Sequence, residues 1–125
     1  KMLYNYLNNE INKTSYSNFI VLGDWNDDLK DDSNAHGFHP FLEDERFYFV
    51  NDRIVHDQTQ ASYPKEPYVS FLDHILITEA LLPSSSSYRV QTLRMDEYMG
   101  SFEVYERYIS DHMPVYLGLP ISFVE

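Results

Sequence analysis

Three short segments place aspartate and histidine side chains beside apolar stretches of the chain. Residues 23–27 read Gly-Asp-Trp-Asn-Asp, residues 71–75 read Phe-Leu-Asp-His-Ile, and residues 109–114 read Ile-Ser-Asp-His-Met-Pro. A charged group within or beside a buried strand costs free energy unless a partner compensates it, so core packing explains three such segments poorly. Carboxylates that converge with an imidazole suit a hard divalent cation and a water molecule that is to be activated. The three segments are therefore candidates for one hydrolytic site.

The strands expected around these segments indicate how the side chains could meet. Residues 19–22 form an unbroken apolar run that predicts a strand buried on both faces, and Asp24 follows it. Asp111 and His112 stand just before residues 114–119, which predict a further strand. If these two strands run antiparallel, the end of the first and the start of the second share one rim of the sheet. Two carboxylates and an imidazole would then converge there.

The rest of the chain predicts short strands and helices. Residues 2–11 have apolar side chains at a spacing of four, which predicts an amphipathic helix, and residues 69–78 predict a central strand. We expect Phe71, Ile75 and Ile77 on one face of that strand and Leu72, His74 and Leu76 on the other. Further expected elements are a helical turn at 38–42, a strand at 46–50, a helical turn at 79–82 capped by Thr78, and a strand at 88–95. This mixture predicts a layered α/β or α+β sheet protein.

Composition excludes several classes of protein. Hydrophobic residues make up 43% of the 125 residues, too many for a disordered chain, and no apolar run approaches the roughly 20 residues needed to cross a bilayer. The charge balance of 9 Lys and Arg against 20 Asp and Glu gives −11, which offers no obvious basic track and weighs against tight, metal-free DNA binding but not against phosphoester chemistry. The lack of cysteine excludes disulfides and thiolate metal ligands. We expect one soluble globular domain, and the sequence leaves its localisation open.

The three segments also carry a resemblance to a known family. GDWND is similar to the Gly-Asp-x-Asn motif of the endonuclease/exonuclease/phosphatase family (DNase I-like superfamily), SFLDHILIT to its Leu-Asp-His/Tyr motif, and ISDHMPVYL to its Ser-Asp-His-x-Pro-Val motif. The motifs occur in the family's order, and the resemblance extends from Phe19 to Leu119. It implies that residues 1–125 are the C-terminal half of such a domain: half of a four-layer α/β sandwich, with one mostly antiparallel or mixed sheet and flanking helices.

The resemblance also implies a role for each motif residue in metal-dependent phosphoester hydrolysis. Asp24 would position or deprotonate the attacking water, and Asn26 would bind a phosphate oxygen and hold Asp24. His112 would contact the scissile phosphate, and Asp73 would accept a hydrogen bond from the other nitrogen of His112 and so fix its tautomer. Asp111 would be a ligand of Mg²⁺ or Mn²⁺. In the family an N-terminal half supplies further metal ligands, so we expect this chain alone to have little hydrolytic activity.

Other interpretations of these residues are kept beside this one. The chain could be a non-catalytic family member that serves as an interaction or structural domain, or an unrelated acidic metal-binding module. The phosphoester substrate is open among nucleic acid, phospholipid and sugar phosphate. We expect His74 to be a hydrogen-bonded structural histidine and Trp25 to be a packing residue. His36 and His39 could line the site, but we expect solvent-facing roles for them. For the acidic cluster we expect a solvated turn rather than a second metal site; its members are Asp27, Asp28, Asp31 and Asp32.

Overall fold

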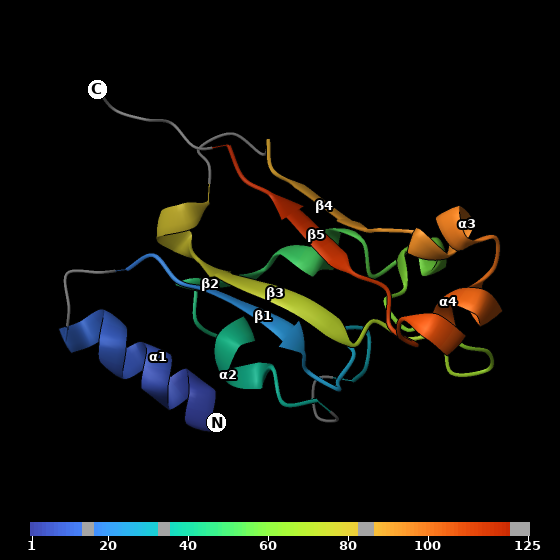
Figure 1. Cartoon of the computed structure of the whole chain (residues 1–125). Helices are drawn as coiled ribbons and strands as arrows, with labels where there is room; N and C mark the ends of the chain where they lie inside the picture. Colours follow the sequence, from blue (N-terminus) through green and yellow to red (C-terminus); the bar gives the residue numbers. More distant parts are fainter. Residues whose placement is uncertain (14–16, 33–35, 83–86, 121–125) are drawn as a thin grey trace.

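The chain folds into two small antiparallel sheets with helices around them (Figure 1). The computed structural model describes residues 1–13, 17–32, 36–82 and 87–120. Its strands are β1 (Ile20–Asp24), β2 (Phe47–Phe49), β3 (Asp73–Thr78), β4 (Arg89–Thr92) and β5 (Val115–Gly118). Its α-helices are α1 (Met2–Lys13), α2 (His39–Leu42), α3 (Met95–Met99) and α4 (Phe102–Tyr108), and short 3-10 helices are η1 (Val50–Arg53), η2 (Gln58–Gln60) and η3 (Glu79–Leu81). The α+β class expected from the sequence is confirmed.

The first sheet has the order β1-β3-β2, and β3 pairs antiparallel with both neighbours. Side chains alternate between the two faces of a strand, so Asp73, Ile75 and Ile77 share one face of β3, whereas His74 and Leu76 share the other. The register with β1 places Asp24 directly opposite Asp73. The sheet thus brings the first two candidate carboxylates together at one end.

Each face of this sheet is covered by other elements, with α1 and α2 on one side and β4 and β5 on the other, as Figure 1 shows. On one face, α1 and α2 contribute Leu7 and Phe41 to a buried cluster that contains Leu76 and is rich in aromatic side chains. On the other face, Ile75 and Ile77 pack against β4 and β5, whose Val115 lies in the same cluster. The second sheet consists of β4 and β5. The side of the sheet that carries Asp73 is therefore the side that β5 covers.

Several elements differ from their predicted bounds. β3 begins at Asp73, and Phe71 packs below the preceding loop with Val55 and Ala61, not on the face of Ile75. The amide of residue 72 donates to the Ser62 side chain, so its carbonyl alone, which accepts the N–H of Trp25, continues the pairing beyond β3. The predicted cap at Thr78 is also wrong, because its hydroxyl instead accepts the N–H of Phe19, at 3.0 Å.

Two helices occupy a segment for which the sequence predicted none. The strand expected at 88–95 ends at Thr92, and α3 and α4 follow it. Ser101 caps α4, since its hydroxyl accepts the N–H of Val104 at 3.3 Å, and Gly100 precedes it with a φ of +95° that favours glycine. Within the described ranges, no helix has both the length and the apolar character needed to span a membrane.

Candidate active site

Asp24, Asp73 and His112 meet at the end of the first sheet. Each offers one ligand atom, and these atoms all lie within 4.8 Å of one another. Asp24 is the last residue of β1, Asp73 is the first residue of β3, and His112 lies in the loop between α4 and β5. Only part of the predicted convergence is present: Asp24 and His112 meet, but the second carboxylate is Asp73 and not Asp111. The route also differs, because β1 and β5 belong to different sheets and the antiparallel pairing with β3 brings Asp24 to Asp73.

A hydrogen bond joins Asp73 to His112. The carboxylate Oδ2 of Asp73 lies 2.7 Å from Nδ1 of His112, and both side chains are about one fifth exposed. An ionised carboxylate can only accept, so the hydrogen belongs to Nδ1 of His112. The other ring nitrogen, Nε2, is then the one that can contact a ligand. The pair has the arrangement in which an aspartate orients an imidazole for proton transfer or charge stabilisation.

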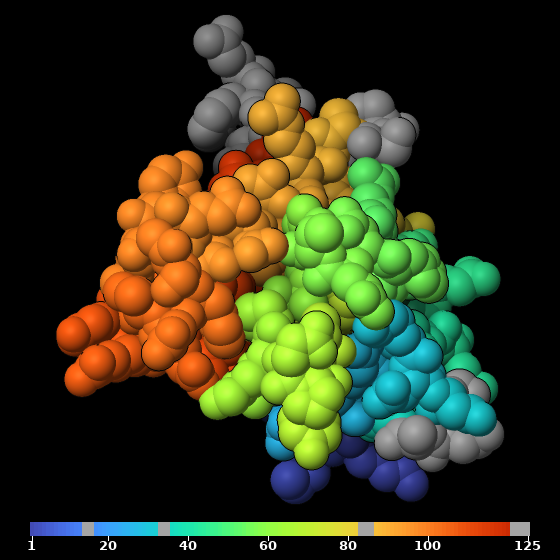
Figure 2. Space-filling view, turned by 90° about the vertical axis from the view of Figure 1, so that its right-hand side faces the viewer, coloured from blue at the N-terminus to red at the C-terminus, as the bar shows by residue number. Residues whose placement is uncertain are grey.

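The loop that carries His112 is held by neighbouring elements. The hydroxyl of Tyr105 in α4 donates to the carbonyl of His112 at 3.0 Å, and the His112 N–H donates to the Ser110 hydroxyl at 3.0 Å. The ring of Tyr63 lies 5.3 Å from the imidazole. Figure 2 shows α4 beside the segment around residues 62–70, and the ion pair between Lys65 and Glu106 joins the two. The imidazole is thus packed between two parts of the chain.

Two residues with positive φ lie at the end of β1 and in the turn that follows it. Gly23 has a φ of +152° and Asn26 a φ of +53°, conformations that favour glycine and tolerate asparagine. This turn lets the N–H of Asn26 donate to Oδ1 of Asp24 at 2.8 Å. Asn26 therefore holds Asp24, as expected, and it does so through its backbone. The role expected for its side chain at a phosphate oxygen stays a prediction.

Asp111 lies outside this cluster. Asp111 is exposed. Among the described residues, the ligand atoms that lie close together belong to Asp24, Asp73 and His112. Asp111 is next to His112 in the chain, but the two side chains are placed differently, and only that of His112 reaches the cluster. The assignment of a metal ligand to Asp111 stays a prediction, and Asp24 and Asp73 are the carboxylates that the structure brings together with His112.

Two buried polar residues support Asp73, and neither is among the residues predicted from the sequence. Ser62 is 1% exposed, and its hydroxyl accepts the N–H groups of Leu72 and Asp73, each at 3.0 Å. Asn51 is also 1% exposed; its Oδ1 accepts the N–H of Ile75 at 2.7 Å and its amide donates to the carbonyl of Asp73 at 3.3 Å. Their residue types occur equally in solvated loops, so only the folded structure distinguishes them.

The other candidate histidines lie outside the cluster. His74 is buried between Phe38 and Phe49, and its Nε2–H donates to the carbonyl of Asp27 at 2.9 Å. Burial lowers the pKa of His74, so this side chain is a neutral structural histidine, as predicted. His36 is buried and accepts the N–H of Phe38 at 3.3 Å, which makes the solvent-facing prediction wrong for it.

His39 and Trp25 behave as expected. His39 is 55% exposed and pairs with Glu43 one helical turn further on, at 3.3 Å. Trp25 packs its ring 5.2 Å from that of Phe49 and donates its indole N–H to the carbonyl of His74. Neither side chain contributes an atom to the cluster.

The expectation of a solvated acidic turn is wrong for Asp28, which is buried. Only 6% of this residue is exposed; its Oδ2 accepts the N–H of Phe71 at 2.9 Å and its Oδ1 accepts that of Lys30 at 2.9 Å. Asp27 in turn accepts the N–H of Gly37 at 2.7 Å, whereas Asp31 and Asp32 are exposed. Asp28 thus ties the loop after β1 to the segment that leads into β3.

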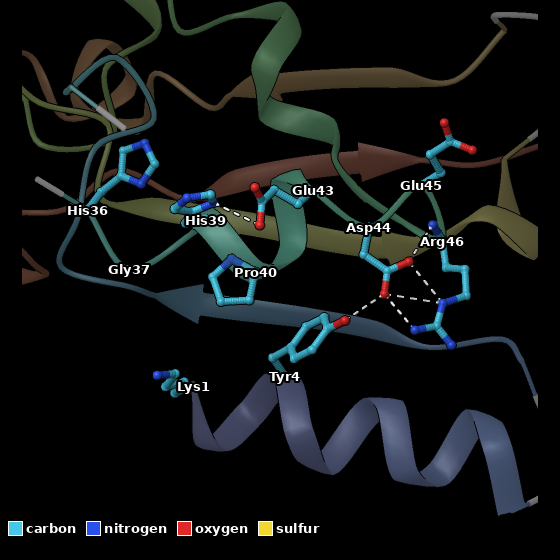
Figure 3. A pocket seen from close by; sticks show the side chains of 10 residues that line it. All are labelled: Lys1, Tyr4, His36, Gly37, His39, Pro40, Glu43, Asp44, Glu45 and Arg46. Carbon is cyan, nitrogen blue, oxygen red and sulfur yellow. Dashed lines mark hydrogen bonds and ion pairs between the residues drawn. The ribbon is translucent and has the colours of Figure 1, made fainter. Parts of the chain in front are cut away.

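A groove between α1 and α2 lies apart from the cluster (Figure 3). Its volume is about 870 Å³, and none of its lining residues belongs to the candidate site. Inside it, the Tyr4 hydroxyl donates to Oδ2 of Asp44 at 2.9 Å, and Nε of Arg46 donates to Oδ1 of the same carboxylate at 2.9 Å. These bonds join α1 to the approach of β2, so we interpret the network as structural.

A second groove has apolar walls and runs beside β1 and β5. It has a volume of about 520 Å³ and is lined by Ile20, Leu22, Ile75, the whole of β5 and Leu119. Leu22 is 69% exposed and Ile20 is 48% exposed, although both side chains lie on the face of β1 that also carries Asp24. An apolar surface therefore extends from the candidate site along the sheet.

Comparison of the chain with protein-family models, with curated protein sequences and with solved structures yields no match.

Proposed function

We propose that this chain is the C-terminal half of a metal-dependent phosphoester hydrolase of the endonuclease/exonuclease/phosphatase family. The observation that carries the proposal is the hydrogen bond between Asp73 and His112 beside the carboxylate of Asp24. These three residues come from three separate motifs, 39 residues apart in the case of Asp73 and His112. Their convergence supports the resemblance, because three functionally unrelated polar segments would not be expected to meet at one end of a sheet.

The donor set suits a divalent cation in part. Carboxylates are ligands that Mg²⁺ or Mn²⁺ accepts, and the two negative charges of Asp24 and Asp73, which lie opposite each other, favour a cation beside them. Mg²⁺ prefers six oxygen ligands, so water, phosphate and further residues would complete its shell. When bound, the cation would neutralise phosphate charge and lower the pKa of a water molecule.

The chain's own residues have distinct tasks in this proposal. Asp73 holds the imidazole of His112 with Nδ1 protonated, so that Nε2 faces the phosphate and, when the ring is charged, donates to a phosphate oxygen. Asp24 accepts a hydrogen bond from the attacking water, since a carboxylate keeps several lone pairs besides the one bonded to Asn26. In-line attack then needs only positioning and charge stabilisation, which are the main demands of phosphoryl transfer.

We propose that the apolar groove beside β1 and β5 receives the N-terminal half of the same domain. Large apolar areas on a protein surface mark contact sites, and exposed Leu22 and Ile20 lie directly beside Asp24 along the strand. A segment that packs there reaches the candidate site and can add metal ligands. This arrangement explains why we expect the isolated chain to hydrolyse phosphoesters poorly.

A second candidate function is a non-catalytic domain of the same family. The observation that favours it is the position of Asp111, which the resemblance treats as a metal ligand but which lies outside the cluster. A domain that has lost its metal would still retain the fold and the bond between Asp73 and His112. Catalytic assays with single variants separate the two candidates.

The test is hydrolysis by the full-length gene product in the presence of Mg²⁺ or Mn²⁺. Bis-p-nitrophenyl phosphate and p-nitrophenyl phosphate report diesterase and monoesterase activity, and chelation with EDTA should abolish either. We expect His112→Ala to lower kcat/KM by about a hundredfold or more. His39→Ala, which removes an exposed imidazole outside the cluster, is the matched control and should leave the rate unchanged. Full activity in His112→Ala would sink the enzyme proposal.

A further inference from the structure

Ser62 touches both sides of the pair formed by Asp73 and His112. Its hydroxyl oxygen accepts the N–H groups of Leu72 and Asp73, each at 3.0 Å, at the point where β3 begins. Its carbonyl accepts the N–H of Met113 at 2.7 Å, directly after His112. A single residue thus fixes the backbone of the hydrogen-bond acceptor and the backbone next to the donor.

The surroundings make this contact rigid. Ser62 is 1% exposed, and its neighbours Ala61 and Met113 are also 1% exposed, so water cannot replace the two amide contacts without opening the structure. The next residue, Tyr63, pairs with Ser70 through two backbone hydrogen bonds of 2.9 Å and places its ring 5.3 Å from the imidazole of His112. The segment is therefore fixed on both sides of Ser62.

We infer that Ser62 is a positioning residue that sets the separation of Asp73 and His112 and thereby selects the imidazole tautomer. The catalytic meaning of this inference rests on the proposed function, but its geometric content does not. Asn51 supports the carbonyl of Asp73 and the amide of Ile75, and so acts on β3 alone. Ser62 differs because it also contacts the loop of His112, which reaches the site from another part of the chain.

The tautomer of His112 provides the readout, because it reports the bond to Asp73 without any turnover. Ring ¹⁵N spectra are recorded at one pH at which the imidazole is neutral, for the unmodified chain, Ser62→Ala, Ser62→Thr and Ser70→Ala. Ser70 is the matched control: its hydroxyl donates to the carbonyl of Tyr68 in the same loop and touches neither Asp73 nor His112. Backbone amide spectra show whether each variant is folded.

We expect the unmodified chain and Ser70→Ala to hold His112 protonated at Nδ1. Ser62→Ala should lower the ratio of the Nδ1–H to the Nε2–H tautomer by about threefold or more. The loss of the Ser62 hydroxyl relaxes the charge-assisted bond between Asp73 and His112, which favours the Nδ1–H tautomer. Ser62→Thr keeps the hydroxyl and should restore the ratio. An unchanged ratio in a folded Ser62→Ala overturns the inference. If the unmodified chain itself lacks the Nδ1–H tautomer, the pair and with it the proposed function fail instead.

A second measurement decides the matter if Ser62→Ala does not fold. Hydrogen exchange in the unmodified chain is recorded for the amides of Leu72, Asp73 and Met113, all of which donate to Ser62. One shared opening event predicts exchange rates that agree within about threefold. Rates that differ by about a hundredfold between Met113 and the other two amides would overturn the inference, because the two sides of the pair would then open independently.

Discussion

Asp24 and Asp73 lie directly opposite each other in the antiparallel pairing of β1 with β3. Two carboxylates at opposed positions repel each other, at a cost of a few tenths to about 1 kcal/mol in a sheet. The bond from His112 to Asp73 offsets part of this repulsion, and a cation would offset more. An arrangement that lowers stability at the end of the central strand is typical of a functional site.

Replacing Asp24 should therefore stabilise the fold while it removes function. Asp24→Asn keeps an oxygen that accepts the N–H of Asn26 and deletes the charge opposite Asp73. We expect the free energy of unfolding in EDTA to rise by about 0.5 kcal/mol, as measured by urea denaturation. Asp111→Asn, at an exposed position outside the cluster, serves as the control and should change nothing. A loss of stability in Asp24→Asn would contradict the repulsion between the carboxylates of Asp24 and Asp73.

Replacing Asp73 tests the orientation of the imidazole. Asp73→Asn preserves the size of the side chain, but its amide can donate to Nδ1 and so favours the wrong tautomer of His112. We expect kcat/KM of the full-length gene product to fall by about 10²- to 10⁴-fold, in line with other pairs of this kind. Asp31 is an exposed residue after β1, and Asp31→Asn controls for the loss of one negative charge from the protein. A fall smaller than about fivefold would argue against an orienting role.

Acid should weaken the link between α1 and β2. The Arg46 guanidinium lowers the pKa of Asp44 from 3.8 to about 2, so the folded state favours the ionised form. The resulting stability is fully present above about pH 4 and is lost as the pH falls toward 2; since Arg46 is 37% exposed, we assign it about 1 kcal/mol. Urea denaturation between pH 5 and 2 should show a smaller loss in Asp44→Asn than in the unmodified chain. Parallel curves would contradict this assignment.

Asp28 should matter more for stability than its acidic neighbours. Asp28→Ala leaves the buried N–H of Phe71 without its acceptor and removes a contact with Lys30. An unsatisfied buried donor costs about 1–3 kcal/mol, so we expect a loss of roughly 2 kcal/mol in urea denaturation. Asp31→Ala is the matched control and should stay within about 0.5 kcal/mol of the unmodified chain. Equal effects of the two substitutions would mean that Asp28 is solvated.

The sequence predicts where the strands lie better than how far they are buried: the expectation that β1 is buried on both faces is wrong, because Ile20 is 48% and Leu22 is 69% exposed. The apolar run before Gly23 and the alternation up to Thr78 identify β1 and the greater part of β3, and the motifs next to them identify Asp24, Asp73 and His112. α3 and α4 were missed because their aromatic residues do not form one apolar stripe: Tyr105 is 3% exposed, whereas Tyr98 is 87% exposed.

Buried polar residues are the part of the site that the sequence could not predict. Asp28, Asn51 and Ser62 belong to residue types that are usually exposed, and nothing in their neighbours distinguishes them from loop residues. Their burial depends on contacts with segments that are 10 to 43 positions away in the chain.

Paramagnetic broadening by Mn²⁺ tests the central claim most directly, since it detects even weak cation binding to the chain. Mn²⁺ is added in substoichiometric amounts while backbone amide signals are followed by NMR. We predict that broadening centres on Asp24, Asp73 and His112 and disappears in Asp24→Asn. Broadening centred on exposed acidic residues such as Asp31, or no selective broadening at all, would contradict the assignment of these three residues to a cation-dependent site.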